Sequence, residues 1–88
     1  FPVTINNPDV HATFYQKEGE SLISVGSWAE EETTFSFKFD WKTLGIDSEK
    51  AVLVAPYIKD FQEERSFHHD ELIPVGSKKG WLFYLREK

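Results

Sequence analysis

The sequence has no cysteine and no methionine, and it contains no long apolar run. The absence of cysteine excludes disulfides, thiol nucleophiles and thiolate metal ligands. No segment approaches the roughly 20 apolar residues that a membrane-spanning helix needs, and no signal peptide is visible. Membrane insertion is therefore not expected. Because the chain starts at Phe1 and has no methionine, we expect it to be a piece of a longer protein.

Positive charge is also scarce. Ten lysines and arginines stand against fifteen aspartates and glutamates, which gives a net charge of −5. Duplex nucleic acid and anionic membrane surfaces both require a positive face, so neither is expected as a partner.

Aromatic residues, by contrast, make up 16% of the 88 residues. Bulky rings fill a small core efficiently, and the length predicts one domain over residues 1–88.

Apolar residues recur with the period of β-strands in several short segments. The clearest spans residues 33–40, where Phe35, Phe37 and Phe39 share one face and polar residues share the other. Residues 10–28 predict a hairpin with a polar turn at 17–20. Further strands are expected at 51–55, 72–75 and 81–86, with weaker, partly exposed segments at 58–62 and 65–68.

Helical structure is expected only as single turns. Asp40 can cap a turn over residues 41–45, with Leu44 packed beneath the sheet. Gly45 ends that turn because glycine readily adopts a positive φ. A second turn is expected at residues 47–49.

These elements predict an all-β fold, a small antiparallel β-sandwich of about seven short strands with one or two single-turn helices. The segment 81–86 is apolar on both faces, which is typical of a central strand. Pro74 indicates an edge strand because proline cannot donate a ladder hydrogen bond. The three phenylalanines of residues 33–40 are expected to line the interior, and Trp81 is expected to be largely buried.

Clusters of residues that could carry chemistry are few. His68, His69, Asp70 and Glu71 are adjacent, but neighbours on a strand point to opposite faces and would not readily hold one ion. The acidic runs 30–32 and 63–64 lack the apolar flank that raises the pKa of a catalytic carboxyl. We therefore predict no catalytic residue, no metal site and no cofactor, and the chain alone is not expected to be an enzyme.

Exposed aromatic rings could instead form a platform for a sugar ring. The candidates are Trp28, Trp41, Trp81, Tyr57 and Tyr84. In so small a domain most of these rings are expected in the core. The alternative is a carbohydrate-binding module, whose platform would use Trp28 and Tyr57.

Several short motifs follow one another in a fixed order from residue 27 onward. They are Ser27-Trp28, Asp40-Trp41-Lys42-x-Leu44-Gly45-Ile46-Asp47, Ala55-Pro56-x-Ile58, Phe61-Gln62, Ile73-Pro74-Val75 and Lys79-Gly80-Trp81. In this order and spacing, over residues 22–85, the chain resembles the C-terminal β domain of bacterial proteins similar to glycoside hydrolase family 123.

The resemblance implies a role rather than a site. Proteins of this kind carry a (β/α)-barrel catalytic domain earlier in the chain, and the catalytic carboxylates belong to that barrel. The resemblance therefore implies a non-catalytic accessory domain whose partner is the catalytic domain of the same chain, with glycan as a second candidate partner. It also implies an exported protein, extracellular or periplasmic.

Overall fold

The computed structural model describes residues 2–17 and 20–88. Within them the chain forms nine β-strands and one short helix, so the all-β prediction is confirmed. In chain order the elements are β1 (Val3–Ile5), β2 (Val10–Lys17), β3 (Glu20–Ser27), β4 (Thr33–Phe35), β5 (Phe37–Phe39), α1 (Trp41–Leu44), β6 (Ala51–Ala55), β7 (Arg65–Phe67), β8 (Ile73–Val75) and β9 (Gly80–Glu87).

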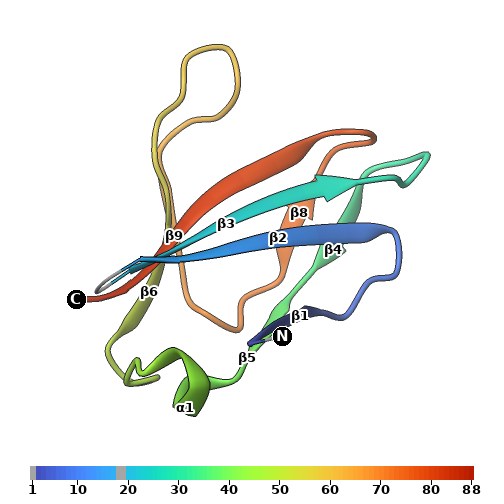
Figure 1. Ribbon diagram of the computed structural model, residues 1–88. Coiled ribbons are helices and arrows are strands. Elements are labelled where there is room, and N and C mark those ends of the chain that lie inside the picture. The colour runs from blue at the N-terminus through green and yellow to red at the C-terminus, as the bar shows by residue number, and fades with distance from the viewer. Residues whose placement is uncertain (1, 18–19) are drawn as a thin grey trace.

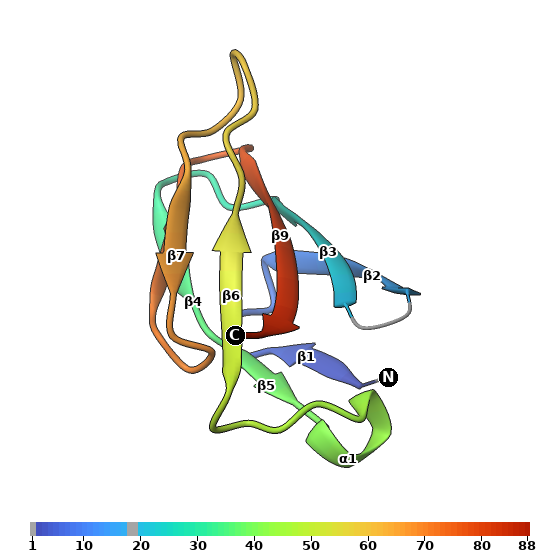
Figure 2. The ribbon, with the colours of Figure 1, turned by 90° about the vertical axis from the view of Figure 1, so that its left-hand side faces the viewer.

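The main layer is a five-stranded antiparallel sheet with the order β2-β3-β9-β6-β7. Its first two strands form the predicted hairpin, whose turn includes Glu18 and Gly19, outside the described residues. The closing strand β9 lies between β3 and β6, as predicted for a segment that is apolar on both faces. Figure 2 shows β7, β6 and β9 side by side, with α1 below them.

The second layer consists of two small sheets, β1-β5 and β4-β8, both antiparallel. In Figure 1 the strands β4 and β8 pass behind β2 and β3. The sandwich-like arrangement is therefore a continuous sheet covered on one face by two short pairs. Pro74 pairs only with Thr34, in a two-stranded sheet, which agrees with the predicted edge position.

The predicted strand over residues 33–40 is divided into β4 and β5 at Ser36. The N–H of Ser36 donates to the side-chain oxygen of Asn6 (2.9 Å), and the carbonyl of Ser36 accepts from the N–H of Asn6 (3.3 Å). Asn7 donates to the Thr33 hydroxyl and the Thr34 carbonyl, both at 3.1 Å. These amides allow the chain to leave β8 and pair with β1 without unpaired backbone groups.

The number of strands exceeds the predicted seven for two reasons. The strand at 33–40 is divided, and the N-terminal residues, which have little apolar pattern, form β1 by pairing with β5. One predicted segment is not a strand: within residues 58–62 only a single bridge joins Ile58 to Gln62. Whether a short segment becomes a strand depends more on its distant pairing partner than on its own sequence. The sequence therefore predicts a β fold more reliably than the number of its strands.

The core lies between the two layers and is built mainly of phenylalanine, leucine, isoleucine and valine. Phe35, Phe37 and Phe39 are all buried, as predicted. The ring of Phe37 meets the ring of Phe83 on β9 edge to face, with centroids 5.7 Å apart. Edge-to-face pairs of this kind are favoured by the ring quadrupole, and this pair joins the two layers.

The helix α1 is a single turn with the predicted caps. The Asp40 carboxylate accepts hydrogen bonds from the hydroxyl (2.8 Å) and the backbone N–H (3.2 Å) of Thr43. The hydroxyl bond is the main reason that the pKa of Asp40 lies below its ordinary value. Gly45 ends the turn at φ 70°, and Leu44 is buried beneath the sheet. The second predicted turn closes with a bond from the Lys50 N–H to the Asp47 carbonyl.

Trp81 packs against the core with only a minor part of its surface exposed, which agrees with the prediction that it is largely buried. Its ring stacks on Phe83 at an interplanar angle of 18°, and its indole N–H donates to the Pro74 carbonyl at 2.7 Å. The other side of the residue lines an open groove. Trp81 is the second residue of β9, and its ring also meets the ring of Phe67 edge to face.

We predict that Phe83→Ala costs about 3–5 kcal/mol, because Phe83 is fully buried and the deletion leaves a cavity. That is much of the roughly 4–13 kcal/mol expected for a domain of this length. Trp81→Ala should cost clearly less, since part of that residue is already in water. Urea unfolding measures both changes, and equal midpoints for the two variants would contradict the difference in burial.

Candidate functional site

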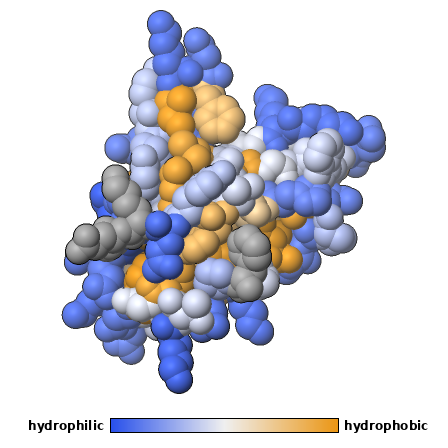
Figure 3. All heavy atoms as spheres, in the orientation of Figure 1, coloured by the Kyte–Doolittle hydropathy of each residue, from blue (hydrophilic) through white to orange (hydrophobic). Residues whose placement is uncertain are grey.

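The outer face of the five-stranded sheet is apolar at its middle. Strand register places Tyr15, Leu22, Tyr84 and Val54 in one row across β2, β3, β9 and β6. Val52 shares this face, and none of the five belongs to the core cluster. We call these five residues the outer apolar patch. Figure 3 shows apolar atoms gathered in a band on the face that Figure 1 presents.

Along the two central strands the outward side chains become smaller toward one end of the sheet. On β3 they pass from Leu22 to Ser24 to Gly26. On β9 the paired residues are Tyr84, then Leu82, then Gly80. Because alternate residues of a strand face the same side, the sheet surface steps down at this end. The result is a depression next to the outer apolar patch.

One wall of this depression is the loop over residues 56–64, which projects beyond the sheet in Figures 1 and 2. The loop closes on itself through hydrogen bonds between Ile58 and Gln62, at 2.9 and 3.0 Å. Asp60 at its tip has a φ of 63°, a left-handed conformation that aspartate tolerates better than most residues. The loop presents Tyr57 and Phe61, which are 60% and 52% exposed.

The side chain of Gln62 fixes this loop to β9. Its amide nitrogen donates to the carbonyls of Pro56 (2.7 Å) and Leu82 (2.9 Å), and its oxygen accepts from the N–H of Leu82 (2.9 Å). Pairing of β6 with β9 ends at Val54 and Tyr84, so Leu82 has no backbone partner on that side. The Gln62 amide therefore takes the place of the next strand residue.

The opposite wall is Trp28, which follows β3 directly and is 66% exposed. Its backbone N–H donates to the Asp9 carbonyl at 2.7 Å, and its carbonyl accepts from Lys78 Nζ at 3.4 Å. The ring of His11 meets the Trp28 ring edge to face, at 5.6 Å between centroids. These contacts hold an exposed ring in a defined position.

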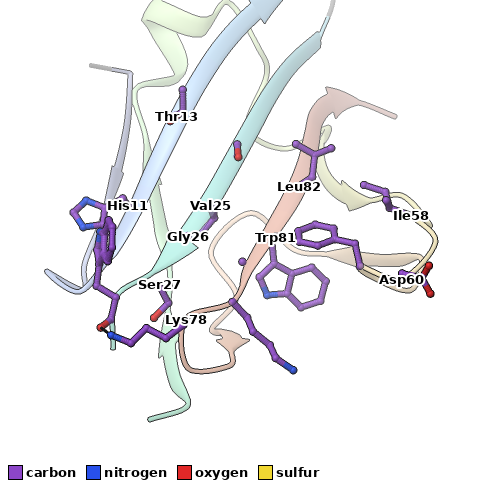
Figure 4. A pocket seen from close by; sticks show the side chains of 15 residues that line it. His11, Thr13, Val25, Gly26, Ser27, Ile58, Asp60, Lys78, Trp81 and Leu82 are labelled. Carbon is purple, nitrogen blue, oxygen red and sulfur yellow. Dashed lines mark hydrogen bonds between the residues drawn. The ribbon is translucent and has the colours of Figure 1, made fainter. Parts of the chain in front are cut away.

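Together these residues enclose an open groove of about 1130 Å³ at one end of the outer face. In Figure 4, His11 lies on one side of the groove, Ile58 and Asp60 lie on the other, and Gly26 lies between them. Serine and threonine hydroxyls and two lysines complete the lining. Asp60 is the one carboxylate among the described residues that line it.

The aromatic residues singled out from the sequence are divided between the core and the surface. Trp41 and Trp81 pack against the core, and Tyr84 lies half-buried in the outer apolar patch. Of the two proposed platform residues, Trp28 lines the groove, while Tyr57 is exposed in the loop and does not line it. Phe61, which the sequence analysis did not select, faces the groove instead.

The His68–Asp70 segment lies in a loop after β7, so the argument from strand alternation does not apply to it. The two imidazole rings lie 4.4 Å apart, and ligand atoms of His68, His69 and Asp70 lie within 4.8 Å of one another. His68 Nδ1 hydrogen-bonds the Asp70 carboxylate, which lowers the pKa of Asp70. His69 packs edge-on against Trp41. The absence of a metal site here stays a prediction.

The acidic runs lie in exposed positions. Glu30, Glu31 and Glu32 follow β3 in a loop, and Glu63 and Glu64 end the projecting loop. Glu30 pairs with Lys78 at 3.4 Å, across the rim of the groove. The single helix of the described residues has four residues and is far too short to cross a membrane.

The fold and this surface define a small β-sandwich module with an apolar outer face and a groove at one end of it. Residues 1–86 match the family described as Glycoside hydrolase 123, C-terminal domain. The chain therefore belongs to that family, as the sequence motifs indicated. No curated protein and no solved structure matches it.

We predict that Gln62→Glu destabilises the chain by about 1–3 kcal/mol, the cost of leaving partly buried polar groups unpaired. The carboxylate loses both donated bonds and faces the Pro56 and Leu82 carbonyls. Gln16→Glu is the matched control, since Gln16 makes one 3.3 Å bond to the Leu44 carbonyl and should cost little. Urea unfolding and amide exchange at Leu82 measure the effect. Equal loss in both variants would contradict the role of Gln62.

Proposed function

We propose that this chain is a non-catalytic accessory domain that packs its outer apolar patch against the catalytic barrel of a glycoside hydrolase. Family membership supports a place beside a catalytic domain in the same protein. The observation that supports the packing is the apolar outer face of the five-stranded sheet. When one face of an antiparallel sheet is in water, the residues along each strand normally alternate between apolar residues on the core side and polar residues on the water side.

That alternation fails where the patch lies. Val52 and Val54 on β6 face outward between the buried residues of the same strand, and Leu22 and Tyr84 do so on β3 and β9. Contiguous exposed apolar surface on a small domain is typical of an interaction site. Interfaces between domains of one chain commonly bury about 600–1,500 Å². The patch crosses four neighbouring strands of the sheet and can form the centre of such an interface.

The location of the carboxylates supports a role outside catalysis. Glycoside hydrolysis generally needs two carboxyl groups facing each other across a cleft. In the groove, Asp60 stands alone among the described lining residues. The catalytic pair would therefore be supplied by the partner domain, and this chain would contribute stability or positioning to it.

We predict that Leu22→Glu combined with Val54→Glu uncouples this domain from the catalytic domain. The two carboxylates would have to be desolvated in the interface, which is costly without partners. In the two-domain protein the shared melting transition should split or move to lower temperature. The fold of this chain alone should survive, because neither residue belongs to its core.

The matched control is Thr4→Glu combined with Thr34→Glu, which adds the same charge at exposed positions of the other layer. Calorimetry of the two-domain protein should show no change in coupling for this control. If both pairs of substitutions shift the transition equally, or if neither does, the outer apolar patch is not the docking face.

We also predict that the 88-residue chain hydrolyses no chromogenic glycoside. The reason is the single carboxylate in the groove, since one acid without a nucleophile or base does not complete the reaction. The measurement is release of the chromophore over hours, with a known glycosidase as the positive control. Turnover that disappears in Asp60→Asn would overturn the proposal.

A further inference from the structure

We propose that the groove between Trp28 and the 56–64 loop binds the rings of a neutral glycan. This site is separate from the docking role of the outer apolar patch, because the patch ends where the outward side chains become small. The groove begins at Ser24 and Leu82 and continues past Gly26 and Gly80.

The first argument comes from two glycines that face each other across β3 and β9. A Cβ at Gly80 would lie 2.1 Å from the Val25 carbonyl oxygen, so packing demands glycine there. At Gly26 an added Cβ would meet nothing within 4 Å, and its φ is not in the left-handed region. Neither packing nor backbone conformation requires glycine at position 26.

A glycine inside a strand weakens it and often marks the close approach of a ligand. Gly26 lies in the middle of the groove floor and leaves backbone open to whatever occupies the space. A β-branched residue would suit the strand better. Glycine at position 26 thus lowers the stability of the strand and leaves the floor of the groove free of a side chain.

The second argument is the composition of the walls. Trp28 and Phe61 present exposed rings from the two sides, and hydrogen bonds fix the backbone of both residues. A pyranose ring has apolar C–H faces that pack on aromatic rings, and its hydroxyls need polar partners. Thr13, Ser24 and Asp60 supply hydroxyl and carboxylate groups in the same groove. Binding sites combine apolar walls with a few convergent polar groups in this way.

The third argument is charge. Lys78 and Lys79 line the groove, but Glu30 pairs with Lys78 at 3.4 Å and Asp60 lies on the opposite wall. The local charges therefore balance, which favours an uncharged ligand over a phosphate or a polyanion. At about 1130 Å³ the groove is larger than most small-ligand pockets, so it has room for more than one sugar ring.

The test uses the 88-residue chain, with its fold verified by the dispersion of its NMR amide signals. A glycan array of neutral and sialylated or sulfated oligosaccharides identifies binders, and titration by NMR measures affinity. We expect neutral oligosaccharides to shift the amides of Gly26, Gly80 and Leu82. Gly26→Val should reduce affinity by about tenfold or more while the melting temperature stays the same or rises. Trp28→Ala should reduce affinity similarly.

Two exposed residues outside the groove provide matched controls. Tyr15→Ala removes a ring from the outer apolar patch, and Leu72→Ala removes an exposed side chain elsewhere, and both should leave affinity unchanged. Absence of binding by any neutral glycan, preference for anionic glycans, or full affinity in Gly26→Val would overturn the proposal. Protection of the groove amides by the catalytic domain in the two-domain protein would also overturn it, and would assign the groove to the docking interface.

Discussion

The backbone pairing of β9 with β3 on one edge and β6 on the other is the interaction on which the rest of the domain depends. β3 and β2 are attached through one edge of β9, and β6 and β7 through the other. Inward, Phe83 and Leu85 form the centre of the core, and Phe83 contacts Phe37 of the second layer. Outward, the same strand supplies Tyr84 to the patch and Leu82 to the groove. One strand thus determines both the stability of the fold and the surface offered to partners.

The second layer is small, and side-chain amides compensate for its short strands. Asn6 and Asn7 pair with the backbone where β4 gives way to β5, and Gln62 pairs with the backbone where β6 ends beside β9. In both places a strand stops before its neighbour does, and unpaired buried backbone groups would be costly. An amide side chain carries the same donor and acceptor as a peptide unit. The domain can therefore end strands early and still form loops with fixed geometry.

The outer face combines two different surfaces within one strand register. The row that contains Leu22 and Tyr84 is apolar and broad, which suits a protein partner. Four residues further along the same two strands, the row that contains Gly26 and Gly80 has no side chains and forms the groove floor. The two surfaces are adjacent but separate. The proposed glycan site would thus stand at the border of the proposed domain interface, close to the enzyme that the domain accompanies.

The sequence by itself determined the fold class, the hairpin, the central position of β9, the burial of the three phenylalanines and the caps of α1. Each of these depends on a local period or on a residue with a special conformation, such as Gly45. The motifs also indicated the family. Tertiary structure decided the division of residues 33–40, the formation of β1 and the groove. Those features depend on which distant strands pair and where they stop, and the contacts responsible, such as Gln62 with Leu82, join residues far apart in the chain and leave no periodic signal.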